Sequence, residues 1–333
     1  MRFFVFISQD PIKLMKTTRR TIRLLRTYNC AHPTDISKRI QLHNYGSDPA
    51  LQDFWLPRFI EAHGLCREKS VGIFSVFGLR SMIRLNRSQI KLFMARENLH
   101  RSNWVEYDDL ALEEKSIDLC LGFDYDVDDP RYMRFPLWIT WLLPPDAGYK
   151  EVKEFCDTIN RPDNSSFDDR KFCAFISSHD DIGRNQLFDE ISQVGAIDSC
   201  GRFKHNCEDL QNKYGDDKLE FLRHYRFNLC PENSDYPGYC TEKIFEAITS
   251  GCIPLYWGSD NNPEPDILNP SAIQFVNVGR PNNADTLNRI AHLNNDREAY
   301  LHMAAQPRLL PQAPDIIMDY LRQLEERIKE ISY

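Results

Sequence analysis

The sequence has little glycine and no glycine-rich nucleotide-binding loop. Only 14 of its 333 residues are glycine, and the pattern G-x-G-x-x-G does not occur. That pattern is typical of dinucleotide-dependent dehydrogenases, so its absence argues against that class. The sequence also shows no internal repeat and no low-complexity tract. With 42% hydrophobic residues, 12% of all residues being aromatic, the chain can form packed globular cores.

Paired cysteines are also missing. The ten cysteines are scattered, no C-x-x-C pair occurs, and several lie in apolar runs such as CAFIS and GCIPLYW. Scattered cysteines in apolar runs favour free, buried thiols in a reducing compartment over a disulfide framework. Without paired Cys/His spacing, a zinc site is not expected.

Long hydrophobic runs are absent as well. The apolar opening ends by Asp10, and the run Phe135–Leu143 is about half the length that a membrane-spanning helix needs. We therefore expect a cytoplasmic protein without a membrane span. The net charge of -8 argues against a general nucleic-acid surface. A basic helix expected over 11–28 either touches an anionic membrane or is the solvated face of a domain helix.

Strand-like and helix-like segments alternate in two blocks, which predicts an α/β protein with two Rossmann-like domains facing a cleft. A polar, proline-containing stretch separates the blocks. We expect a first domain over 1–150, a linker over 151–170 and a second domain over 171–333. The final segment carries apolar residues at helical spacing and predicts a C-terminal helix.

The most informative stretch is 226–259, which indicates a strand, a polar loop, a helix beginning near Thr241, and a second strand. A helix N-terminus at the carboxyl end of a strand is a ready site for anions. Lys243 in its first turn can neutralise a diphosphate, whereas Glu242 is better suited to sugar hydroxyls. From spacing alone, a capped helix with an exposed Lys–Glu pair is the better explanation of these residues.

The run PENSDYPGYCTEKIFEAITSGCIPLYWG resembles the donor-binding signature of the α1,3/α1,4-fucosyltransferases, glycosyltransferase family 10. The matching positions are Glu232, Asn233, Ser234, Tyr239, Thr241, Glu242, Lys243, Pro254, Trp257 and Gly258. Pro231 and Cys240 depart from the pattern, where the family has an aromatic and an aliphatic residue. Thinner similarity extends over 71–305.

The resemblance implies a GT-B fold and a metal-independent, inverting transfer of L-fucose from GDP-fucose. In that mechanism Glu97 is the general base, and Arg184 and Lys243 bind the diphosphate of the donor. Asn233, Tyr239 and Glu242 are expected to hold the ribose or the fucose. Glu232 either does the same or only orients the loop.

Four aspartates in GFDYDVDDP resemble a metal-binding D-x-D pattern or half a calcium loop. The segment lacks the sixth-position glycine and the bidentate glutamate of a calcium loop. It also matches an acceptor-side segment of the family, so no metal or other cofactor is expected. Arg131, Arg134 and Trp138 nearby are candidates to face an acceptor sugar.

The expected partners are GDP-fucose and a glycan acceptor such as N-acetyllactosamine, with transfer to O3 of a GlcNAc or Glc unit in a β-galactoside. One alternative is a related transferase that uses another nucleotide sugar. A second is a catalytically silent protein that binds a glycan or nucleotide, and a third is a metal-dependent hydrolase built on the aspartates. The sequence leaves the acceptor, the linkage and the oligomeric state open.

Overall fold

A computed structural model describes residues 39–45, 54–161, 167–180, 183–279 and 283–333 of the chain. The chain divides into two compact units. The first extends to Gly122 and adds Asp128–Met133 and Leu324–Tyr333, and the second comprises Phe123–Val127 and Arg134–Gln323. These boundaries differ from the expected 1–150 and 171–333, because the chain passes between the units near residue 123 and again in its last helix. The basic segment 11–28 lies outside the described residues.

The first unit is built on a five-stranded sheet in the order β1-β2-β3-β4-β5, with β1 to β4 parallel. Val71, Ile73, Leu92 and Phe93 are almost fully buried, as expected for strands covered on both faces. The elements of this unit are β1 (Ile40–His43), α3 (Trp55–Ala62), β2 (Val71–Phe74), α4 (Ser81–Leu85), β3 (Ile90–Met94), η2 (Ser102–Tyr107), β4 (Leu119–Gly122) and β5 (Tyr132–Arg134).

The second unit has a parallel five-stranded sheet in the order β10-β9-β8-β6-β7. Its strands are β6 (Lys171–Phe175), β7 (Ile197–Ser199), β8 (Tyr225–Leu229), β9 (Ile253–Tyr256) and β10 (Gln274–Phe275). Its helices are α5 (Ile139–Leu142), α6 (Tyr149–Ile159), α7 (Arg184–Ile191), α8 (Asp209–Asn212), α9 (Lys218–Leu222), α10 (Glu242–Thr249), η3 (Ser259–Asn261), η4 (Pro270–Ala272), α11 (Ala284–Asn295) and α12 (Arg297–Ala304). The alternation of strands and helices predicted for this half is confirmed.

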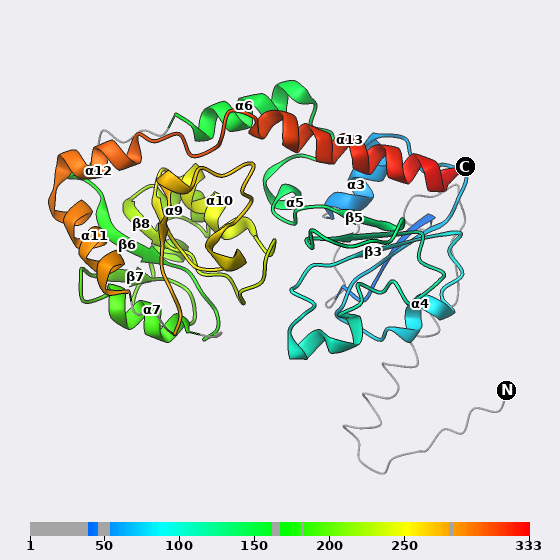
Figure 1. The fold of residues 1–333 in the computed structure, drawn as a ribbon, viewed down its shortest axis with the longest axis horizontal. Helices are drawn as coiled ribbons and strands as arrows, with labels where there is room; N and C mark the ends of the chain where they lie inside the picture. Colours follow the sequence, from blue (N-terminus) through cyan, green and yellow to red (C-terminus); the bar gives the residue numbers. More distant parts are fainter. Residues whose placement is uncertain (1–38, 46–53, 162–166, 181–182, 280–282) are drawn as a thin grey trace, which may run out of the picture. The chain divides into compact units, whose positions relative to one another are not determined.

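Helices cover both faces of the second sheet. On one face, α7, α11 and α12 contribute Leu187, Ile290 and Tyr300 to a cluster that includes Phe227 and Leu255 of the strands. Helix α10 packs against β9, and its Phe245 stacks on Trp138. Figure 1 shows α11 and α12, in orange, on the opposite side of the strands from α10, in yellow. The result is a three-layer α/β unit, as expected for a Rossmann-like half.

The expected linker contains a regular helix, α6, over Tyr149–Ile159. Glu151 accepts a hydrogen bond from the backbone of Gly148 at its N-terminus, and Val152, Cys156 and Ile159 form a buried stripe. That spacing is helical, but the polar residues and the prolines around it obscured the pattern. The C-terminal helix is confirmed as α13 (Ala313–Ser332), with Ile317, Leu321, Leu324 and Ile328 buried.

Two further findings concern the cysteines and the hydropathy of the helices. Nine cysteines lie in the described ranges, all are free, and seven are buried. Within those ranges, no helix combines the length and apolar character needed to cross a membrane.

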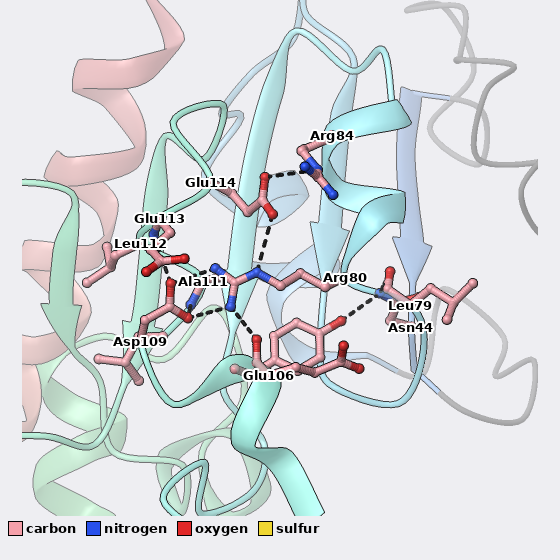
Figure 2. A network of polar contacts seen from close by, with 12 residues as sticks. Asn44, Leu79, Arg80, Arg84, Glu106, Asp109, Ala111, Leu112, Glu113 and Glu114 are labelled. Atoms are coloured by element: carbon pink, nitrogen blue, oxygen red, sulfur yellow. Dashed lines mark hydrogen bonds and ion pairs between the residues drawn. The ribbon is translucent and has the colours of Figure 1, made fainter. Parts of the chain in front are cut away.

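A partly buried polar network ties together loops of the first unit (Figure 2). The guanidinium of Arg80 donates to both carboxylate oxygens of Asp109 at 2.5 Å and to Glu114 at 3.2 Å. It also contacts the carbonyl of Glu106. A bidentate pair of this kind fixes both side chains in one geometry. The network therefore holds the segment after η2 against the loop that follows β2.

His43, at the end of β1, should make the stability of the fold depend on pH. It is 8% exposed, stacks on Phe74, and lies 3.0 Å from the amide nitrogen of Asn86. Burial lowers the pKa of His43 from 6.5 to about 4. Burial disfavours the protonated imidazole in the folded state, so protons favour the unfolded chain. The contribution of neutral His43 to the free energy of unfolding is therefore complete above pH 6.5 and is lost as the pH falls towards 4.

We expect the free energy of unfolding to fall by about 2 kcal/mol more between pH 7 and pH 5 in the wild type than in His43→Gln. Urea unfolding at several pH values measures this difference. His302→Gln, at an exposed histidine of α12, is the matched control and should keep the wild-type slope. Parallel pH profiles for the wild type and His43→Gln would contradict the assignment.

Candidate functional site

The strand order of the second unit reverses between β6 and β8. Strand β6 connects through α7 to β7 on one side, and β8 connects through α10 to β9 on the other. The loops after two such strands diverge, which leaves a crevice at their carboxyl ends where α/β proteins bind ligands. The segments after these two strands, 176–184 and 230–243, contain most of the site residues predicted from sequence.

Arg184 is the first residue of α7 and is only 4% exposed. Its guanidinium donates to Ser177 Oγ at 2.9 Å, to the carbonyl of His179 at 3.1 Å, and to Asn233 Oδ1 at 2.6 Å. The preceding Gly183 has φ of 81°, and a Cβ there would lie 2.0 Å from Val278. Glycine is therefore required to bring Arg184 to this position.

Glu232 is fully buried and makes its contacts inside the unit. Its carboxylate accepts hydrogen bonds from the backbone N–H of Thr241 at 2.8 Å, from the Thr241 hydroxyl at 2.7 Å, and from Lys243 Nζ at 2.9 Å. The hydroxyl of Tyr256 lies 3.4 Å away. Of the two roles that the sequence left open, this geometry favours the one that orients the loop and the start of α10.

Lys243 lies in the first turn of α10, with 21% of its side chain exposed. Its ammonium contacts Glu232, the hydroxyl of Thr241 at 2.8 Å, and Glu242 at 3.9 Å. Burial lowers the pKa of Lys243, but the carboxylates of Glu232 and Glu242 outweigh it, so the pKa lies above its ordinary value. The ammonium is therefore fully charged at neutral pH.

Arg184 and Lys243 bind to consecutive residues at the end of β8. Arg184 donates to Asn233, and Lys243 donates to Glu232. The positive charge of Arg184 acts on Lys243 and by itself lowers the pKa of that ammonium. Together with the N-terminus of α10, they form a cationic cluster at the carboxyl end of the sheet, which suits a negatively charged ligand.

Glu242 and Tyr239 differ in exposure. Glu242 is half-buried beside Lys243. Tyr239 is 2% exposed, and its ring lies 5.1 Å from that of Phe123. The structure thus brings five predicted residues together in one unit, namely Arg184, Glu232, Asn233, Glu242 and Lys243. The role of Tyr239 in holding a ligand stays a prediction, since its ring also packs in the core.

Glu97 belongs to the first unit, where it follows β3 and is half-buried. The adjacent Arg96 lies over the rings of Tyr45 and Phe54, at 5.6 and 5.3 Å. Asn98 is buried, and its Oδ1 accepts a hydrogen bond from the backbone of His100. These neighbours hold the segment after β3, and the role of Glu97 as a base stays a prediction.

The three residues proposed to face an acceptor sugar all contact other residues of the protein. Trp138 is fully buried and stacks on Phe245 at 4.1 Å, so the expectation that its ring faces a sugar is wrong. Arg134 pairs with the buried Glu264 at 2.8 Å. Arg131 binds Asp129 and the carbonyl of Leu112. Trp138 and Arg134 make these contacts with segments distant in sequence, which a local motif does not reveal, whereas Arg131 combines a local pair with Asp129 and a contact with the more distant Leu112.

Across the described ranges, no three His, Cys, Asp or Glu side chains are grouped closely enough to hold a metal ion. Asp129 of the aspartate segment is instead bound by Arg131, and hydrogen bonds from Arg131 lower the pKa of that carboxyl.

Sequence reasoning missed Ser177 and Asp235 in the site. Ser177 accepts from Arg184, and Asp235 accepts a hydrogen bond from the backbone of Asp260 at 2.6 Å. Polar residues directly after a buried strand were the available signal for Ser177. No sequence signal connects Asp235 to residue 260, because only the fold brings them together.

Two α/β units, each built on a largely parallel sheet and one of them with a cationic cluster at its switch point, fit the GT-B class of glycosyltransferases that the resemblance implied. The model of the glycosyltransferase family 10 (fucosyltransferase) C-terminal region matches residues 167–304. That of the α-(1,3)-fucosyltransferase FucT N-terminal domain matches residues 45–141. The chain belongs to glycosyltransferase family 10.

Curated relatives match parts of the chain. It is 30% identical to α-(1,3)-fucosyltransferase FucT of Helicobacter pylori over 214 residues, which cover 56% of this chain and 42% of the relative. It is 31% identical to α-(1,3)-fucosyltransferase B of Drosophila melanogaster over 157 residues, 44% of this chain and 35% of the relative. The chain thus spans less than half the length of these relatives.

Solved structures share the fold. An α1,3-fucosyltransferase crystallised with GDP-fucose superimposes with a TM-score of 0.57 at 20% identity, over 86% of this chain and 90% of that one. The same score and identity hold for an α1,3-fucosyltransferase with GDP, over 91% of this chain and 96% of that one. The GT-B fold predicted from the sequence is confirmed.

Glu232→Gln should destabilise the second unit, because the amide lacks the charge that compensates the partly buried Lys243. We expect a loss of about 2 kcal/mol in the free energy of unfolding, measured with urea. Glu242→Gln is the matched control. The carboxylate of Glu242 lies 3.9 Å from Lys243, and its removal should change stability by less than about 0.5 kcal/mol. Equal unfolding midpoints for the two variants would show that Glu232 does not anchor α10.

Proposed function

We propose that the chain transfers L-fucose from GDP-fucose to a hydroxyl of a sugar acceptor, with inversion at the anomeric carbon. The observation that carries the proposal is the cationic cluster formed by Arg184 at the start of α7 and Lys243 in the first turn of α10. This cluster lies within the residues that match the fucosyltransferase C-terminal region. A relative's structure with GDP-fucose, which shares this fold, supports the choice of donor.

The cluster can stabilise the diphosphate as it leaves. When the bond between fucose C1 and the phosphate oxygen breaks, negative charge grows on the GDP leaving group. Preorganised cations and free backbone N–H groups stabilise developing charge of this kind most effectively. Glu232 keeps Lys243 in place, and Ser177 and Asn233 do the same for Arg184. We therefore propose that these two side chains supply the charge without a metal ion.

In the proposed mechanism, Glu97 supplies the base. Its carboxylate takes the proton of the acceptor hydroxyl while that oxygen attacks C1 of fucose, and GDP leaves with the electrons of the broken bond. Inversion follows from a single displacement. Support comes from the match to the family motif and from the position of Glu97 after a buried parallel strand. As the acceptor we propose O3 of GlcNAc or Glc in a β-galactoside.

The first test is release of GDP from GDP-fucose in EDTA, with and without N-acetyllactosamine, with the product analysed by mass. We expect release that depends on the acceptor, and a disaccharide heavier by one fucose. Release without transfer would keep the donor and exclude this acceptor. Binding of GDP-fucose without any turnover would indicate a silent binding protein. Activity with a different nucleotide sugar, or only after manganese is added, would contradict the donor or the metal-free mechanism.

Glu97→Gln should lower kcat by about 100-fold or more, because a positioned general base contributes roughly that much. Affinity for GDP should stay unchanged, since Glu97 has no part in the cationic cluster. Glu113→Gln, at an exposed glutamate of the same unit, is the matched control and should retain full activity. Steady-state kinetics and calorimetric titration with GDP measure both quantities. Normal kcat in Glu97→Gln would assign the base to another residue.

A further inference from the structure

A left-handed turn follows β9 in the second unit. Ser259, Asp260 and Asn261 have φ values of 53°, 53° and 51°, and Gly258 before them has φ of 139°. A side chain in the left-handed region costs about 1–2 kcal/mol per residue, and three consecutive non-glycine residues there are rare. Strain of this kind persists only where surrounding contacts fix it, and it is concentrated at functional sites.

Two hydrogen bonds join this turn to the loop that follows β8. The backbone N–H of Asp260 donates to Asp235 Oδ1 at 2.6 Å. The backbone N–H of Gly238 donates to Ser259 Oγ at 3.1 Å, and Ser259 is 1% exposed. The bonds run in opposite directions, since the turn provides a donor for one and an acceptor for the other. The turn therefore holds the loop 233–238 at Asp235 and at its last residue, Gly238.

The turn itself is anchored to the sheet. A Cβ on Gly258 would lie 2.7 Å from Cγ of the buried Glu232, so the turn packs directly on the residue that orients α10. Asn261 Nδ2 donates to Asn277 Oδ1 at 3.0 Å, beyond the end of β10. The carbonyl of Gly258 accepts from the N–H of Asn261 at 2.9 Å, which closes the turn. A rigid segment thus supports the loop.

The supported loop begins with Asn233, which accepts the 2.6 Å hydrogen bond from Arg184. We propose that Gly258–Asn261 positions the loop 233–238 for binding of a nucleoside diphosphate, with Ser259 and Asp235 as positioning residues. The inference rests on the proposed function. The left-handed conformation aims the N–H of Asp260 at Asp235 and the Ser259 hydroxyl at Gly238. In this way the turn limits the positions open to Asn233, and through it to Arg184.

Asp235 allows a clean test because its side chain is exposed. Asp235→Ala removes the acceptor for the N–H of Asp260, whereas Asp235→Asn keeps a carbonyl oxygen at the same place. Loss of one hydrogen bond of this kind corresponds to about a fivefold change in an equilibrium constant. Asp266→Ala, at another exposed aspartate of the same unit, is the matched control.

The measurements are calorimetric titration with GDP, steady-state kinetics with GDP-fucose, and thermal unfolding of the full chain. We expect Asp235→Ala to weaken GDP binding about fivefold and to raise KM for GDP-fucose similarly. Its kcat at saturation and its unfolding temperature should stay near wild type. Asp235→Asn should restore affinity, and Asp266→Ala should match the wild type. Ser259→Ala should weaken GDP binding in the same way.

Two results would overturn the positioning role alone. One is wild-type GDP affinity in both Asp235→Ala and Ser259→Ala. The other is equal loss in Asp235→Asn and Asp235→Ala, which would mean that the carboxylate charge acts on the ligand directly. A wild-type protein that binds neither GDP nor GDP-fucose would instead overturn the proposed function, and the inference with it.

Discussion

The buried carboxylate of Glu232 is the contact on which the rest of the site depends. A fully buried acid is costly unless its oxygens are bonded, and here the start of α10 supplies the donors. The carboxylate therefore fixes the backbone of Thr241 and the ammonium of Lys243, and the Cβ and Cγ atoms of the same side chain pack against Gly258. Because the same charge keeps Lys243 protonated, the cation needed for a diphosphate is held in place before any ligand binds.

The two units carry different parts of the proposed chemistry. The second unit gathers positive charge at the point where its strand order reverses, and the strand-end loops that diverge there are free to bind a ligand. The first unit holds Glu97 after a buried parallel strand, and a network around Arg80 stabilises other loops of that unit. The proposal thus assigns leaving-group stabilisation and proton removal to different units. A substitution in the first unit should therefore leave binding of the donor by the second unit intact.

Backbone strain and hydrogen bonding are balanced in the turn after β9. The left-handed residues are each unfavourable, but in this conformation the N–H of Asp260 and the hydroxyl of Ser259 bind the loop after β8. A more relaxed turn would cost less and would leave that loop to fluctuate. The arrangement resembles the support that catalytic groups need from neighbouring side chains if they are to stay within a few tenths of an ångström of a working geometry.

The sequence alone determined the α/β class, the helix beginning at Thr241, the terminal helix and the residues at the ends of β6 and β8. Each of these follows from local periodicity or from a motif whose spacing is local, and the motif also identified the family. Only the tertiary structure decided that Glu232 is a buried anchor, that Trp138 belongs to the core, that α6 occupies part of the expected linker, and that Asp235 meets residue 260. These depend on contacts between segments far apart in the chain. Burial and long-range pairing arise when the sheet and its helices pack. The spacing of residues along the chain therefore does not predict them.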